Sequence, residues 1–211
     1  MKPIAQSEEK KSSPHIICLT GKMAAGKNYV ASILEKSGYI SLDADQLVHK
    51  AIDSLTQEIF QAFKEEAERS GIQLLTKENK IDRRALGSLI FPRPQLLKRQ
   101  EDLVYPRIIQ MTREFFKENE GKNIILNATV LYKTPELLNM CSKIIFVTAP
   151  LQVRLLRAKK RDTIPVKKIL DRFKSQKNLL QEYQKYGIPL IKINNCGNDK
   201  SLIKKLKKAG L

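Results

Sequence analysis

The sequence predicts an α/β protein with a five-stranded parallel sheet, a helical insert and a helical lid. Three observations carry this prediction. Five short apolar segments recur along the 211 residues, helical patterns separate them, and a glycine-rich turn follows the first segment directly. Short continuous apolar runs are typical of strands that are buried on both faces, and parallel strands need helical crossovers. The length suits one globular domain, and 42% hydrophobic residues suffice for its core.

The first strand is expected at residues 15–20, HIICLT, and the turn GKMAAGKN follows at residues 21–28. Residues 29–38 carry apolar side chains at helical spacing and end on Gly38, a typical helix stop. Further strands are expected at residues 39–45, 123–131, 142–150 and 187–195. The core of the fold therefore comprises residues 15–45, 123–150 and 187–211.

Two intervals between strands are too long for a single crossover helix. Residues 46–122 carry several helical patterns and are expected to form a helical subdomain. Residues 151–186 predict a basic helical excursion, which we interpret as a lid over the core. Residues 1–14 lack the apolar run of a signal peptide and are expected to be a short disordered lead-in.

The chain is strongly basic, with 39 Lys and Arg against 22 Asp and Glu and a net charge of +17. The excess is spread along the chain and no aromatic-rich stacking motif accompanies it, so nucleic acid is an unlikely partner. Residues 151–177 are the most basic stretch, and a polyphosphate ligand explains it as well as nucleic acid does. No apolar run is long enough to span a membrane, which predicts a cytoplasmic protein.

The spacing G-x-x-x-x-G-K in residues 21–27 is typical of a phosphate-binding loop. Such loops point backbone N–H groups at phosphate oxygens, the following helix adds its positive end, and the lysine reaches the β and γ phosphates. Its position between a strand and a helix supports this interpretation. We expect alanine to be accommodated at negative φ and Lys22 to point outward. The candidate nucleotide ligands are Gly21, Lys22, Met23, Ala24, Ala25, Gly26, Lys27, Asn28 and Tyr29.

Asn28 stands where a serine or threonine hydroxyl commonly coordinates Mg²⁺. Its amide oxygen is a hard neutral ligand that Mg²⁺ accepts, directly or through a water molecule. The alternative is that Asn28 merely caps the helix.

A second acidic motif, LDAD, lies at the end of the second expected strand. In an extended chain Asp43 and Asp45 fall on one face, at the edge of the sheet where ligands bind. A carboxylate there can accept a proton from an attacking hydroxyl and help to hold Mg²⁺. Either aspartate could instead cap the helix that begins near Gln46.

Seven segments in this order resemble the dephospho-CoA kinase family: ICLTGKMAAGKN, SLDADQLVHKAI, IDRRALGSLIF, EDLVYPRI, RLLRAKKRD, FKSQ and INNCGNDKSL. They span roughly residues 15–205. The resemblance implies a three-layer P-loop kinase fold in which residues 46–122 bind the acceptor and residues 151–186 form the lid. It further implies that ATP, with Mg²⁺, phosphorylates the ribose 3′-hydroxyl of dephospho-CoA. A monomer is favoured.

The resemblance also implies roles for individual residues. Asp45 would be the general base, Lys27 and the lid residue Arg157 would act in catalysis, and Asn28 and Asp45 would hold the metal. Arg161 lies four residues after Arg157, so both could clamp phosphate from one helix face. The family pattern places Arg83 and Tyr105 on the acceptor side, and Asn195 and Gly197 near adenine.

The chain departs from the family pattern at several positions near metal and acceptor. Tyr105 stands where histidine is typical, Lys133 stands near a commonly acidic place, and Asn127 opens a segment that usually reads differently. The alternative hypothesis is therefore a diverged, catalytically weak nucleotide-binding protein of the same fold, with a possible nucleic-acid association.

Overall fold

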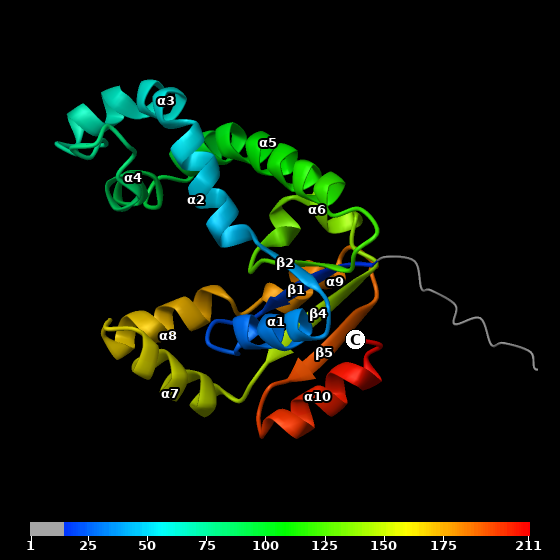
Figure 1. Cartoon of the computed structure of the whole chain (residues 1–211). Coiled ribbons are helices and arrows are strands. Elements are labelled where there is room, and N and C mark those ends of the chain that lie inside the picture. The colour runs from blue at the N-terminus through cyan, green and yellow to red at the C-terminus, as the bar shows by residue number, and fades with distance from the viewer. Residues whose placement is uncertain (1–14) are drawn as a thin grey trace, which may run out of the picture.

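The structure, a computed structural model, describes residues 15–211 and contains a five-stranded parallel sheet (Figure 1). The lead-in expected at residues 1–14 lies outside the described residues. The order across the sheet is β2-β3-β1-β4-β5, and every neighbouring pair is parallel. This arrangement confirms the expected sheet. The strands are β1 (Ile16–Gly21), β2 (Ile40–Asp43), β3 (Ile124–Asn127), β4 (Lys143–Thr148) and β5 (Leu190–Asn194).

The central position of β1 brings the ends of its neighbours to the loop that follows it. Leu19 is in register with Asn127 of β3, and Gly21 with Val147 of β4. Asp43, the last residue of β2, pairs with Asn127. Because the carboxyl ends of parallel strands share one edge of the sheet, residues 22–28 emerge among these strand ends.

Alternating side chains of the strands supply two separate apolar layers. Ile17 and Leu19 face the layer that α1 (Lys27–Lys36) and α10 (Asp199–Lys208) cover, whereas Cys18 faces the opposite layer. The second layer contains α5 (Pro94–Glu118), α6 (Pro135–Asn139) and α9 (Leu179–Gln184). Helices on both faces of the sheet give the three-layer architecture that continuous apolar strands require.

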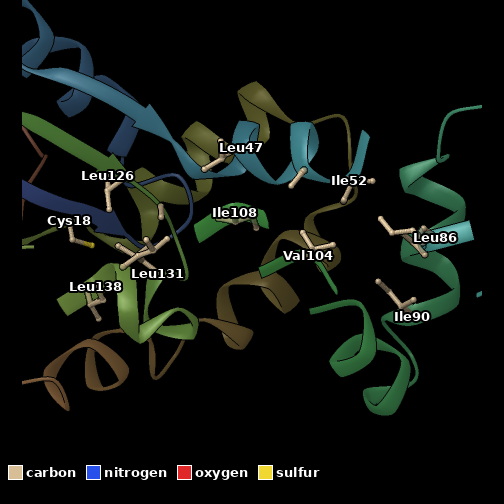
Figure 2. Packing of buried hydrophobic residues seen from close by; sticks show 14 of the residues in the cluster. Cys18, Leu47, Ile52, Leu86, Ile90, Val104, Ile108, Leu126, Leu131 and Leu138 are labelled. Atoms are coloured by element: carbon tan, nitrogen blue, oxygen red, sulfur yellow. The ribbon is translucent and has the colours of Figure 1, made fainter. Parts of the chain in front are cut away.

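The core continues from the sheet into the helices of residues 44–118 (Figure 2). These are α2 (Ala44–Ser54), α3 (Thr56–Arg69), α4 (Arg83–Ile90) and α5. Figure 2 shows Leu126 of β3 at one end of the cluster and Leu86 of α4 at the other, with Val104 and Ile108 of α5 between them. Within residues 15–211, no helix is both long and apolar enough to cross a membrane.

The basic stretch forms α7 (Leu151–Arg161) and α8 (Val166–Ser175), followed by α9. Ala158, Ile169 and Phe173 make a small core between α7 and α8, and Met23 and Ala24 pack against it. The lid hairpin therefore touches the glycine-rich loop directly, and Figure 1 shows it beside the start of α1. A short 3-10 helix, η1 (Leu131–Lys133), follows β3.

Four of the expected strands are shorter than predicted, and the one expected at residues 142–150 runs only from Lys143 to Thr148. The strand expected at residues 39–45 ends at Asp43, because the Asp43 carboxylate accepts hydrogen bonds from the backbone N–H groups of Asp45 and Gln46 and starts α2. The segment expected at residues 123–131 leaves the sheet after Asn127. The last strand begins at Leu190 rather than at residue 187, where Gly187 has a φ of +66°.

Tyr183 of α9 joins the second layer to the turn after β3. Its ring is fully buried, and its hydroxyl donates to the Thr129 carbonyl at 3.1 Å and accepts from the Leu131 N–H at 2.9 Å. Burial is the largest of the causes that raise the pKa of this phenol, so it stays neutral and keeps both bonds. The backbone of residues 129–131 therefore depends on one side chain.

We expect Tyr183→Phe to lower the free energy of unfolding by about 1–3 kcal/mol, because it leaves the buried Leu131 N–H without its acceptor. Urea unfolding of the full chain measures this loss. Tyr39→Phe, which changes a partly exposed tyrosine against the other layer, is the matched control. Equal effects of the two substitutions would contradict the assignment.

Candidate functional site: a phosphate-binding cleft

A cleft of about 570 Å³ opens at the carboxyl edge of the sheet. The loop after β1 forms its floor, the first turn of α2 one side, and the lid the other. It brings together eleven of the predicted site residues with four that were not predicted. The lining residues are Gly21, Lys22, Met23, Ala24, Gly26, Lys27, Asn28, Tyr29, Asp45, Arg157 and Arg161, together with Thr129, Arg172, Ser175 and Gln176.

Both glycines of the loop lie against neighbouring chain segments. A Cβ atom at Gly21 would collide with the Val147 carbonyl of β4. One at Gly26 would collide with the Asn195 side chain, and Gly26 has a φ of +90° that favours glycine. The spacing of the two glycines therefore follows from the close approach of β4 and of the segment after β5.

Several backbone N–H groups of the loop point to no protein acceptor. The N–H groups of Lys22 and Ala25 bond to carbonyls of the protein. Within residues 15–211, those of Ala24, Gly26 and Lys27 have no such partner. Unpaired N–H groups at the start of a helix form an anion-binding cradle, since the helix dipole adds to their partial positive charge.

One conformational expectation for the loop is wrong. Ala24 adopts a φ of +60°, in the left-handed region, rather than a negative φ. Its methyl group instead packs against the lid core, which glycine could not do. Lys22, expected to point outward, is partly buried and is among the residues that line the cleft.

Lys27 brings a buried positive charge to the cleft. Its ammonium group is buried, and it has no hydrogen-bond partner among the described residues. Burial lowers the pKa of Lys27, and the opposing influence of Asp45 and Asp43 is smaller. An uncompensated cation beside free N–H groups fits a polyanionic ligand.

The two aspartates of LDAD separate into different roles. They do not share a strand face, because Asp45 lies in the first turn of α2. Asp43 caps that helix, which confirms the capping alternative for this residue. Asp45 is exposed and lines the cleft opposite the lid. The cap positions Asp45, because its bonds define where α2 begins.

Asn28 does not cap α1, since Gly26 is the N-cap residue and no side chain caps this helix. Its Oδ1 atom accepts a hydrogen bond from Asn127 Nδ2 at 3.2 Å. Asn127 is 3% exposed, and its own Oδ1 is buried without a partner among residues 15–211. The Asn28 oxygen is thus turned toward the end of β3.

The two predicted lid arginines lie at the cleft with different partners. Arg157 donates to the Ala25 carbonyl at 3.2 Å and to the Asn195 carbonyl at 3.1 Å. Arg161 pairs with the carboxylate of Asp162 at 2.7 and 3.0 Å. Arg157 therefore supports the loop from the lid, whereas Arg161 stands on the outer rim.

Residues predicted to lie near adenine occupy the back of the loop. Asn195 is 6% exposed, and its Nδ2 donates to the Ala25 carbonyl at 2.9 Å. It contacts Gly26 and Arg157 rather than the open cleft. Gly197 is exposed, with a φ of +130°, in the turn before α10. Neither residue lines the phosphate cleft.

Two further cavities continue from the cleft toward the helical subdomain. The first, about 60 Å³, shares Asp45 and Thr129 with the cleft and also reaches Tyr105. The second, about 380 Å³, is largely apolar and is lined by residues of α2, α4 and α5, with Arg83 among them. Tyr105 lines both of these cavities. The first cavity therefore lies between the cleft, with which it shares Asp45, and the second cavity, with which it shares Tyr105.

Charged residues that line the second cavity take part in two ion pairs. Lys133 of η1 pairs with Glu101 of α5 at 2.5 Å, which ties the helical subdomain to the segment after β3. Arg83 pairs with Asp53 at 3.1 Å. Burial, followed by the influence of Glu101, raises the pKa of Tyr105, so this phenol stays neutral.

Four functional candidates escaped residue-by-residue reasoning: Arg154, Arg172, Ser175 and Gln176. Arg172, Ser175 and Gln176 line the cleft, and Arg154 donates to the Met23 carbonyl at 2.9 Å. The excess of basic residues in 151–177 and the matched segment FKSQ pointed to this region. Neither signal could select one arginine over another, because the choice depends on how α7 and α8 dock on the loop.

Comparisons with known proteins agree with this geometry. The sequence profile of one family, described as CoaE, dephospho-CoA kinase, matches residues 15–196. A dephospho-CoA kinase of Treponema denticola is 36% identical over 205 residues, which cover 95% of this chain and 91% of the relative. One of Treponema pallidum is 31% identical over 194 residues, covering 90% and 92%.

Two solved structures are similar over most of their length. TT1252 from Thermus thermophilus has a TM-score of 0.78 at 26% identity and covers 94% of this chain and 97% of that chain. A dephospho-CoA kinase from Campylobacter jejuni has a TM-score of 0.64 at 25% identity and covers 92% and 94%.

We expect Lys27→Met to weaken nucleotide binding about 10- to 100-fold, because a charge-assisted hydrogen bond is lost. The same substitution should raise the free energy of unfolding, since it removes a buried ammonium whose folded-state pKa lies below the ordinary 10.5. This gain is largest below the folded-state pKa and shrinks as the pH rises toward 10.5.

Calorimetric titration with ADP and urea unfolding at several pH values measure the two effects. Lys36→Met, at the exposed end of the same helix, is the matched control and should retain binding. Unchanged ADP affinity in Lys27→Met would contradict the assignment of the cradle.

Proposed function

The chain belongs to the dephospho-CoA kinase family, and we propose that its cleft transfers the γ-phosphate of ATP to the ribose 3′-hydroxyl of dephospho-CoA. The observation that carries this proposal is the buried ammonium of Lys27 beside N–H groups of the loop, none of which has a hydrogen-bond partner within residues 15–211. A folded protein tolerates such unpaired donors where a ligand satisfies them. ATP supplies the phosphate oxygens that this cradle lacks.

Asp45 is the proposed general base. It stands where the phosphate cleft meets the cavity that leads to the helical subdomain. An acceptor hydroxyl held at this junction would face both the carboxylate and the terminal phosphate. Phosphoryl transfer needs chiefly positioning and charge neutralisation, and the Asp45 carboxylate would take the proton that the hydroxyl loses.

The lid would neutralise charge that spreads over the transferring phosphate. Arg161 and Arg172 line the outer wall of the cleft, across from the loop. Arg157 holds the Ala25 carbonyl and also lines the cleft, so it would act on both the loop and the phosphates. Guanidinium groups suit this task because they stay charged and bind phosphate through two N–H groups.

The residues at the cleft fit a magnesium ion that keeps most of its water and phosphate ligands. Asp45 offers one exposed carboxylate, and no group of three or more His, Cys, Asp or Glu side chains in residues 15–211 could hold a metal by itself. We propose Asp45 as the direct ligand and Asn28 as an indirect one, because the Asn28 oxygen already accepts from Asn127. Bound Mg²⁺ would offset the negative charge of the phosphates.

The apolar cavity beyond Asp45 is the proposed acceptor site. Its walls come mainly from aliphatic residues of α2, α4 and α5, which suits the extended pantetheine arm better than a small nucleoside. Tyr105 stands at the entrance as a neutral hydrogen-bonding group, and Arg83 at the far rim offers a positive charge for the acceptor's diphosphate. These assignments support residues 46–122 as the acceptor-binding subdomain.

The decisive experiment measures ADP release by the purified chain with dephospho-CoA, with adenosine and without acceptor, across a titration of Mg²⁺. We expect release only with dephospho-CoA, and an unusually high Mg²⁺ requirement, because the Asn28 oxygen is engaged by Asn127. Folded protein that binds ADP yet shows no acceptor-dependent release would reject the kinase assignment in favour of a binding protein.

We expect Asp45→Asn to lower kcat about 100- to 10,000-fold, because the proton acceptor and the proposed Mg²⁺ ligand are lost together, with little change in the affinity for ADP measured without Mg²⁺. Steady-state kinetics and calorimetry on the same preparation separate the two quantities. Asp102→Asn, on the exposed face of α5, is the matched control and should keep normal turnover. Turnover that survives in Asp45→Asn would reject this residue as the base.

A further inference from the structure

The glycine-rich loop contains one residue in a conformation that its type disfavours. Ala24 has a φ of +60°, and for an alanine the left-handed region is disfavoured roughly five- to thirty-fold. Without contacts from other segments, the loop would spend part of its time in other conformations. Its nucleotide affinity would then fall in proportion to the fraction of molecules that keep the binding conformation. Contacts from outside the loop must therefore hold Ala24 where it is.

Two lid side chains form hydrogen bonds with the peptide groups that precede Ala24. Arg154 Nε donates to the Met23 carbonyl at 2.9 Å, and this carbonyl belongs to the peptide that sets the φ of Ala24. Gln176 Oε1 accepts from the Met23 N–H at 2.6 Å. On the other side, the Ala25 N–H bonds to the Lys22 carbonyl at 3.0 Å. Both peptides that flank Ala24 are thus restrained.

Arg154 differs from the other lid arginines in its surroundings. It is 6% exposed, and its guanidinium stacks over the Phe173 ring at 4.2 Å. Its Nη2 atom is buried with no hydrogen-bond partner within residues 15–211. A buried guanidinium with an unsatisfied nitrogen is costly, and its protein acceptor, the Met23 carbonyl, is a loop backbone atom.

Apolar contacts connect the same elements. The Ala24 methyl group and the Met23 side chain pack against Ala158, Ile169 and Phe173. An alanine at this position therefore adds lid contact that a glycine would lack. Apolar contacts as well as hydrogen bonds therefore join the lid hairpin to the loop.

We propose that Arg154 and Gln176 form a clasp through which the lid holds the strained loop in its phosphate-binding conformation. They are positioning residues that act through Met23 and Ala24, and not through contact with the transferred phosphate. The inference rests on the proposed function only in that the loop binds a nucleotide. Preorganisation of this kind removes a conformational penalty from ligand binding.

The test measures the affinity of the full chain for a fluorescent ADP derivative without acceptor, in Arg154→Met and in Gln176→Leu. Both substitutions keep the approximate side-chain volume and remove the hydrogen bond to the Met23 backbone. We expect about tenfold weaker binding in each, and an unchanged KM for dephospho-CoA in those variants that turn over. Wild-type affinity in both variants would overturn the proposal.

Rescue by glycine distinguishes a clasp from a general structural role. In an Ala24→Gly background the left-handed conformation carries no penalty. The loss of ADP affinity caused by Arg154→Met should therefore shrink at least fivefold. Ala25→Gly is the matched control, because Ala25 is the next alanine of the same loop and lacks a positive φ. It should give no rescue. An equal loss in the Ala24→Gly and wild-type backgrounds would overturn the proposal.

Circular dichroism and thermal unfolding confirm that each variant is folded before binding is measured. If Arg154→Met does not fold, Gln176→Leu with and without Ala24→Gly provides the same test, since Gln176 is only partly buried. A wild-type chain that binds ADP without transferring phosphate would refute the proposed function alone, because the clasp is assessed by ADP binding.

Discussion

A phosphate-binding loop must keep a buried ammonium group and several backbone N–H groups unpaired until its ligand arrives. The rest of this structure depends on that constraint, because unsatisfied donors in a partly dry site destabilise the fold that carries them. Lys27 contributes most of this destabilisation, because its ammonium group is buried without a hydrogen-bond partner within residues 15–211. The sheet offsets this cost by placing the loop among the ends of β2, β3 and β4, where β1 fixes its start and α1 its end. The loop is then held from outside, by side chains that belong to other elements.

Those side chains come from three segments that are distant in sequence. Asn195, after β5, and Arg157, from α7, both donate to the Ala25 carbonyl. The lid side chains Arg154 and Gln176 hold the Met23 peptide. A loop with fewer glycines than usual can keep its shape in this way, because hydrogen bonds from a docked lid replace the conformational freedom that glycine would provide. The basic character of residues 151–177 accordingly serves both the loop backbone and the cleft.

A shared apolar core joins the sheet to the helical subdomain. The apolar cluster of Figure 2 runs from Leu126 in the sheet through Ile108 of α5 to Leu86 of α4. The helical subdomain and the sheet thus share one core on this face, and the cavities that lead away from Asp45 lie along it. The Asp45 carboxylate, the proposed general base, lines both the cleft and the first of these cavities because the Asp43 cap starts α2 directly at the end of β2. A change in this cap would therefore move Asp45 relative to the phosphates.

The amino-acid sequence alone determined the five parallel strands, the spacing of the loop, the basic lid and the candidate base, because burial on both faces and glycine spacing leave local patterns. Three features needed the tertiary structure. Asp43 and Asp45 were expected on one strand face, but a side-chain cap ended the strand between them. The left-handed Ala24 could not be read from its residue type, since alanine adopts that conformation only under contacts made by the lid. The hydrogen bond from Asn127 to Asn28 joins residues 99 positions apart, and only the alignment of β3 beside β1 brings them together.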